Sequence, residues 1–106
     1  SLRNKANIQS IDKYELDCAC VDEDSNLHAY ITIGDGVVGK DKVFMIKDLW
    51  YDDEKALVML REYLFREENI IKHRSKEIWH SKTKKEVIDI LHFVDRGDGL
   101  YSWQFE

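Results

Sequence analysis

The sequence lacks proline, has few cysteines and contains no long hydrophobic run. A membrane-spanning helix needs about 18 or more consecutive apolar residues, so no such helix is predicted, and no charged-then-apolar start typical of a signal peptide is present. We therefore expect a soluble, cytoplasmic protein. Cys18 and Cys20 are separated by one residue, which would strain a disulfide, and we interpret them as free thiols of a reducing compartment.

The sequence also has fewer basic than acidic residues. The 16 Lys and Arg residues against 21 Asp and Glu residues give a formal net charge of −5. Because affinity for nucleic acids comes mainly from Lys and Arg contacts to phosphates, this balance argues against nucleic-acid binding and suits a basic partner. The 106 residues show no repeat, linker or low-complexity segment, so a single domain spanning residues 1–106 is predicted.

Gly34, Gly36 and Gly39 have the G-x-G-x-x-G spacing of a phosphate-binding loop, and Lys40 follows. Such a loop must end a strand and open a helix, because the helix N-terminus binds the anion. Here the chain continues into "KVFMI", which is rich in β-branched and aromatic residues and predicts a second strand. We therefore expect a β-hairpin with the glycines in its connection, where glycine reaches positive φ without a steric clash.

The pattern of hydrophobic residues predicts the individual strands, alternating in residues 27–33 and 100–106 and apolar on both faces in residues 43–49. Residues 27–33 indicate a half-buried strand, residues 43–49 a strand in the middle of a sheet, and residues 100–106 a closing strand. Weaker patterns at residues 6–11 and 14–21 favour a short strand and an edge strand or ordered coil. Residues 66–80 remain unassigned, with strand signals at 70–71 and 78–79.

Two amphipathic helices are predicted. Asp52 is the expected N-cap of the first and Asn69 its stop, while Thr83 and Glu86 form the capping box of the second and Gly97 its end. The order of elements predicts an α+β fold, with a mostly antiparallel sheet of about four to five strands and the two helices packed on one face.

The sequence offers candidate residues for a zinc site and for a histidine-based catalytic site. Cys18, Cys20 and His28 offer three zinc ligands, but the C-x-C spacing is unusual and a fourth ligand is missing, so we expect neither a metal site nor a cofactor. His73, His80 and His92 offer imidazoles, but nothing in the sequence brings them together on a cleft.

Acidic residues gather in three places. These are Asp22, Glu23 and Asp24 in one turn, Asp35 and Asp41 around the glycines, and Asp52, Asp53 and Glu54 at the helix start. Such runs are usually solvated turns and helix caps. Aromatic residues next to the last group, Trp50 and Tyr51, favour an interface, because aromatics anchor contacts and carboxylates steer a basic partner.

The run "ITIGDGVVGKDKVFMIKDLW", residues 31–50, resembles the signature of the immunity protein 8 family of bacterial polymorphic toxin systems. In that family an "IG" and further glycines precede a Phe-containing strand that ends near a Trp-Leu or similar step. The closing "WQFE", residues 103–106, resembles the family's "W-E-F-E", and the order of elements between the motifs is similar. The resemblance covers residues 27–106.

The resemblance implies an antidote from a toxin-producing bacterium, including those that use contact-dependent growth inhibition. Such a protein binds and neutralises a cognate C-terminal toxin domain, for which a basic nuclease is expected, and is not an enzyme. The acidic composition agrees, since an acidic binder can occupy a nuclease groove in the manner of phosphates. The candidate toxin-binding residues are Asp22, Glu23, Asp24, Asp35, Trp50, Asp52 and Asp53.

Two rival functions stay open at this point. One is a small histidine-dependent nuclease or phosphate-handling enzyme that uses His73, His80 and the Lys40 loop. The other is an adaptor that binds a protein unrelated to any toxin. The sequence does not define the toxin, the toxin surface that is covered, or the oligomeric state.

Overall fold

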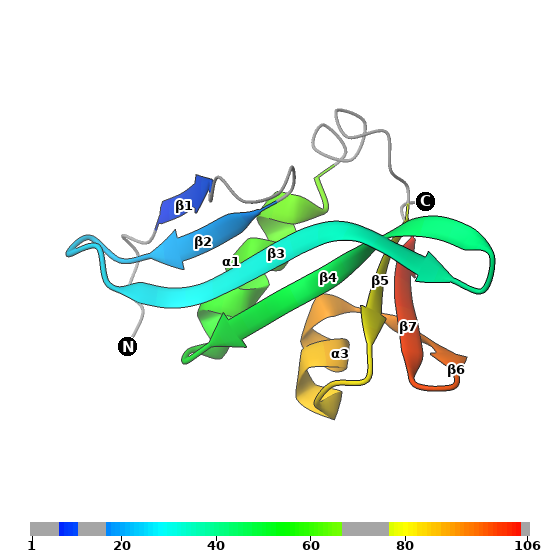
Figure 1. Cartoon of the computed structure of the whole chain (residues 1–106). Coiled ribbons are helices and arrows are strands. Elements are labelled where there is room, and N and C mark those ends of the chain that lie inside the picture. Colours follow the sequence, from blue (N-terminus) through cyan, green and yellow to red (C-terminus); the bar gives the residue numbers. More distant parts are fainter. Residues whose placement is uncertain (1–6, 11–16, 67–76, 105–106) are drawn as a thin grey trace.

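The computed structural model describes residues 7–10, 17–66 and 77–104, which form an α+β fold with one mixed sheet (Figure 1). The order of the seven strands in the sheet is β1-β2-β3-β4-β5-β7-β6. The strands are β1 (Asn7–Ser10), β2 (Cys18–Val21), β3 (Leu27–Val38), β4 (Asp41–Tyr51), β5 (Glu77–Ser81), β6 (Val94–Gly97) and β7 (Leu100–Gln104), and the helices are α1 (Glu54–Leu64) and α3 (Lys85–Leu91).

The predicted fold class is confirmed, but the sheet is larger than the four to five strands expected and is not purely antiparallel. Strands β4 and β5 run parallel, whereas the other five pairings are antiparallel. The cause is the connection through α1, because a crossover returns the chain to the start of the next strand in the same direction. Both helices contribute buried residues, such as Leu57 and Leu91, to one core with the sheet.

The predicted hairpin forms between β3 and β4, but only one of the three glycines of the motif lies in its connection. Gly39 takes a positive φ of 62° in the turn. Gly34 and Gly36 instead lie within β3, opposite Met45 and Val43. A Cβ atom on Gly36 would lie 2.7 Å from the Cβ of Met45, so glycine is needed there for close approach of the two strands.

Strand β2 was predicted as an edge strand or coil, and it lies inside the sheet between β1 and β3. All four of its residues are buried. Cys18 and Cys20 are fully buried free thiols in the hydrophobic core, where a free cysteine packs like a small apolar side chain.

The first helix starts one residue later than predicted. The N-cap is Asp53, whose carboxylate accepts the backbone N–H of Lys55 at 2.9 Å, and Asp52 instead lies just after β4. The helix ends at Leu64, and the predicted stop at Asn69 lies outside the described residues.

The second helix is shorter than its hydrophobic spacing predicts, and the predicted capping box does not form. Its N-cap is Lys84, which makes no side-chain capping bond, and the carboxylate of Glu86 accepts the hydroxyl of Tyr51. The helix ends at Leu91, where His92 adopts a left-handed conformation with φ 59°, and not at Gly97. The next residues form β6, because a reversal after Leu91 buries Phe93 in the core.

The segment 66–80 had no predicted structure. Its last residues belong to β5, which pairs with β7. The predicted closing strand is confirmed as β7, with Tyr101 and Trp103 packed against the core, while Phe105 lies outside the described residues. The ring of Trp103 stacks on Phe65 with centroids 4.1 Å apart. Within the described chain, neither helix has the length and apolar character needed to cross a lipid bilayer.

Candidate functional site

An exposed aromatic pair lies on the face of the β3–β4 hairpin that points away from the core. In β3 the residues Ala29 and Ile31 are fully buried, so Tyr30 between them points to the opposite face. Tyr30 lies directly across from Trp50 of β4, and the two rings stack with centroids 6.4 Å apart and planes inclined by 23°. Trp50 is 41% exposed, which makes it one of the large hydrophobic residues that face solvent.

Two carboxylates lie on either side of Trp50, Asp48 within β4 and Asp52 directly after its end. Asp48 contacts Tyr30 and Asp52 contacts His28, and these two residues of β3 are two apart and share a face of the sheet. Asp48 accepts a hydrogen bond from the hydroxyl of Tyr30 at 2.9 Å and one from the backbone N–H of Leu49 at 2.9 Å. The hydrogen bond to Asp48 raises the pKa of Tyr30, because the carboxylate favours the protonated phenol.

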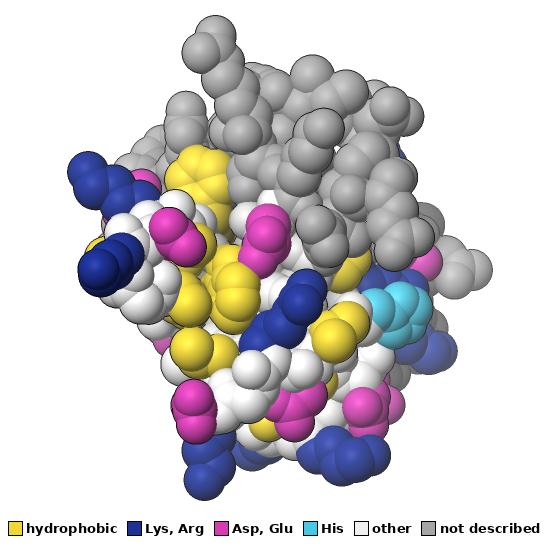
Figure 2. Space-filling model, turned by 90° about the vertical axis from the view of Figure 1, so that its right-hand side faces the viewer, with side chains coloured by type: hydrophobic (Ala, Val, Ile, Leu, Met, Phe, Trp, Pro, Cys, Tyr) yellow, Lys and Arg dark blue, Asp and Glu magenta, His cyan; other side chains and the backbone are white. Residues whose placement is uncertain are grey.

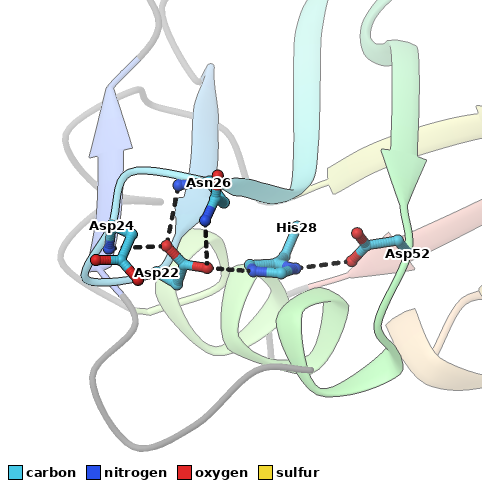
Figure 3. Close-up of polar contacts among 5 residues, drawn as sticks. All are labelled: Asp22, Asp24, Asn26, His28 and Asp52. Atoms are coloured by element: carbon cyan, nitrogen blue, oxygen red, sulfur yellow. Dashed lines mark hydrogen bonds and ion pairs between the residues drawn. The ribbon is translucent and has the colours of Figure 1, made fainter.

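His28 joins two of the acidic residues (Figure 3). Its Nε2 lies 2.8 Å from Oδ2 of Asp22, and its Nδ1 lies 2.9 Å from Oδ1 of Asp52. An ionised carboxylate only accepts hydrogen bonds, so both contacts are satisfied only when both ring nitrogens carry a proton. The hydrogen bonds to Asp22 and then Asp52 accordingly raise the pKa of His28, and the bond from His28 is the main cause that lowers the pKa of Asp22 to about 2.

Asp22 also organises the turn between β2 and β3. Its Oδ1 accepts the backbone N–H groups of Asp24 and Asn26, both at 2.9 Å, and the side-chain amide of Asn26 donates to Oδ2 at 3.3 Å (Figure 3). These bonds hold the turn while Ser25 takes a positive φ of 65°. The local sequence "DEDSN" therefore fixes the position of the carboxylate that binds His28.

We call this surface the aromatic–acidic patch. Its members are Asp22, His28, Tyr30, Asp48, Trp50 and Asp52. The patch unites three of the predicted contact residues from separate parts of the sequence, namely Asp22, Trp50 and Asp52. Asp52 is the more open of the two carboxylates on His28, with 48% of its side chain exposed.

The other predicted contact residues lie elsewhere or at the margin. Glu23 and Asp24 are exposed in the same turn as Asp22. Asp53 is the N-cap of α1, so its carboxylate has a local structural role. Asp35 is exposed opposite Phe44, in the half of the hairpin near the turn and about 23 Å along β3 from His28, so it is not part of the patch.

Sequence reasoning missed His28, Tyr30 and Asp48 as members of the patch. The two-residue alternation of β3 did place His28 and Tyr30 on one face, and this was the available signal. Asp48 needed the strand register, in which Thr32 lies opposite Asp48 and Tyr30 opposite Trp50.

The zinc alternative does not fit the geometry. Cys18 and Cys20 lie in the core, whereas His28 lies on the opposite face of the sheet. Burial raises the pKa of Cys18 to about 12, which disfavours the thiolate that binds zinc. Across residues 7–10, 17–66 and 77–104, no group of three or more metal-ligating side chains comes together.

The histidines of the enzyme alternative lie in different environments. His80 is buried in β5, with its ring edge-on to Phe93 at 6.3 Å. His92 is exposed at the end of α3, where its Nε2 lies 3.2 Å from Nη1 of Arg61. His73 lies outside the described residues.

Hydrophobic side chains are also exposed elsewhere in the sheet, including Val37 of β3 and Val94 of β6. On the face drawn in Figure 2, Lys and Arg as well as Asp and Glu side chains lie among hydrophobic ones. Charges of both signs on one face favour no particular sign of charge in a partner.

A scan against known protein families finds no family that matches this chain, and a search among curated proteins finds no match either. The resemblance to the immunity protein 8 family rests on the motifs at residues 31–50 and 103–106.

Proposed function

We propose that this protein is an immunity protein that binds and neutralises a cognate toxin domain, most simply a basic nuclease, without chemistry of its own. The observation that carries the proposal is the exposed Trp50, stacked on Tyr30 and flanked by Asp48 in β4 and Asp52 directly after it. An exposed aromatic anchor flanked by carboxylates is typical of a surface that binds a basic protein. The resemblance to the immunity protein 8 family is the reason to propose a toxin domain as this partner.

The roles of the two kinds of side chain differ. Carboxylates at the edge of an interface mainly raise the association rate, whereas a buried aromatic residue slows dissociation. An antidote needs nanomolar affinity, about −12 kcal/mol, which complexes reach through roughly 800 Å² per partner. The aromatic–acidic patch would form the centre of such an interface, with the exposed turn residues Glu23 and Asp24 at its rim.

The test is co-expression with the C-terminal domain encoded by the gene immediately upstream, followed by binding kinetics on the purified pair. We expect the Asp48→Asn and Asp52→Asn double variant to associate more slowly, with a weaker dependence on salt, because it removes two steering charges. Asp35→Asn, which removes the same kind of charge outside the patch, is the matched control. Unchanged rates and salt dependence in the double variant would rule out steering by the patch.

The aromatic anchor is tested separately. Trp50→Ala should accelerate dissociation by tenfold or more, since loss of a hot-spot aromatic costs about 2 kcal/mol or more. Tyr63→Ala, which truncates an exposed aromatic residue on α1, should leave dissociation unchanged. If the two variants behave alike, the proposed binding surface is wrong even when the antidote function holds.

A further inference from the structure

We infer that the aromatic–acidic patch recognises an arginine side chain of the partner, with its guanidinium group stacked on Trp50 and hydrogen-bonded to Asp52 and Asp48. This inference rests on the proposed function, because it names the chemical group by which a basic protein partner is held. It starts from the sequence D-x-W-x-D at the end of β4, which places an indole ring between the carboxylates that contact Tyr30 and His28 of β3.

The spacing of the carboxylates excludes a metal ion shared between them. Asp48 and Asp52 are four residues apart, and the residues between them are extended at the end of β4, so their Cα atoms lie about 13 Å apart. The side chain of Trp50 occupies the position between them. Carboxylates that bind one Ca²⁺ or Mg²⁺ ion must each approach to about 2.0–2.6 Å. A flat cation that spreads its donors over several ångströms fits this arrangement better than a point charge.

The hydrogen-bonding capacity of the patch points to the same group. One oxygen of Asp52, Oδ2, accepts no hydrogen bond from the described residues, and its side chain is half exposed. Asp48 accepts one bond on each oxygen and retains a lone pair on each. Arginine presents five N–H donors in a plane and stacks well on indole, whereas the lysine ammonium is a strongly hydrated point charge.

The hydrogen bond from Tyr30 to Asp48 stabilises the Tyr30–Trp50 ring pair on which the guanidinium would stack. It fixes the phenol ring of Tyr30 next to Trp50, so the indole is backed by a second ring at a centroid distance of 6.4 Å. His28 holds Asp52 from the other side through its Nδ1 contact at 2.9 Å. The ring and the carboxylate that would receive the guanidinium are therefore already in place before binding, which lowers the entropic cost of recognition.

The test compares two capped peptides of equal length and charge, hexa-arginine and hexa-lysine, as probes of the full chain. Dissociation constants come from ¹⁵N NMR titrations at fixed salt, with the indole N–H of Trp50 as one reporter. Non-specific attraction to an acidic protein is about the same for both peptides, so the ratio of their affinities isolates stacking and planar hydrogen bonding. We expect hexa-arginine to bind about five- to tenfold more tightly, with shifts centred on Tyr30, Trp50 and Asp52.

Three variants make the comparison specific. Trp50→Leu should reduce the arginine-to-lysine ratio to near one, and Trp50→Phe should retain part of it, since phenylalanine is a weaker cation–π partner. Asp35→Asn should leave the ratio unchanged. Equal affinities of wild type for the two peptides, or a ratio that survives in folded Trp50→Leu, would overturn the inference. Either result leaves toxin neutralisation by co-expression intact, so the two failures are distinguishable.

Discussion

Replacement of His80 by leucine should stabilise the protein, and the gain should increase as the pH falls. His80 is only 8% exposed, it packs edge-on against Phe93, and neither ring nitrogen has a hydrogen-bond partner among residues 7–10, 17–66 and 77–104. An unsatisfied buried polar group costs about 1–3 kcal/mol. Leucine has a similar volume and no polar atom, so at pH 7.5 we expect the free energy of unfolding of His80→Leu to rise by about 1 kcal/mol.

The sign of the pH effect follows from burial, which lowers the pKa of His80. An unfolded chain protonates this histidine below about pH 6.5, whereas the folded chain does not until a lower pH. Below pH 6.5 the wild type therefore loses stability, by up to about 1.4 kcal/mol per pH unit, until the folded pKa is reached. The difference between His80→Leu and wild type should grow between pH 6.5 and 5.5, by at most about 1 kcal/mol.

Urea unfolding followed by tryptophan fluorescence at pH 7.5, 6.5 and 5.5 measures both effects. His80→Gln is the matched control, because it keeps a buried polar group but cannot titrate. The free energy of unfolding of His80→Gln should lack the pH dependence that wild type owes to His80, and at pH 7.5 it should not exceed the wild-type value. A His80→Leu variant that is less stable than wild type at every pH, by a constant amount, would show that the imidazole makes favourable contacts, and the reasoning would be refuted.

Two further predictions concern the hairpin and the patch. Gly36→Ala should destabilise the fold by about 1–3 kcal/mol, because its Cβ would lie 2.7 Å from the Cβ of Met45, and an unchanged urea midpoint would contradict this close approach. Gly39→Asn is its control and should cost less than about 0.5 kcal/mol, since nothing lies within 4 Å and asparagine tolerates positive φ. Asp22→Asn should lower the pKa of His28 in an NMR titration, because it replaces the main cause of the raised value, and an unmoved pKa would show that Asp22 does not hold the imidazolium. The stabilisation from His28 should be complete below its unfolded pKa of about 6.5 and be lost as the pH rises through the raised folded pKa.

The sequence predicted the hairpin and the closing strand because residues 27–33 and 100–106 alternate clearly and residues 43–49 are rich in β-branched and aromatic side chains. The parallel pairing of β4 with β5 was not predictable from local pattern, since it depends on how α1 carries the chain back along the sheet. Local rules also failed where tertiary contacts compete with them. Glu86 fits a capping box in the sequence, but its carboxylate binds Tyr51 in the structure.

The end of the second helix shows the same competition. Val94 continues the helical spacing of the preceding residues, yet it lies in β6 and is exposed, while Phe93 is buried. Burial of Phe93 thus determines where the chain leaves the helix. Of the candidate site, the acidic turn and Trp50 were predictable from composition and position, whereas Asp48 required the register of β3 against β4.

The most direct test of the antidote function is growth rescue. The C-terminal domain encoded immediately upstream is expressed in a host that it kills, with and without this protein, and the pair is then purified through a tag on the toxin domain. The proposal predicts full rescue and a stable one-to-one complex with wild type, and faster dissociation of the complex formed by Trp50→Ala. A domain that kills despite equal expression of the wild-type protein, and that does not bind it, would contradict the antidote function.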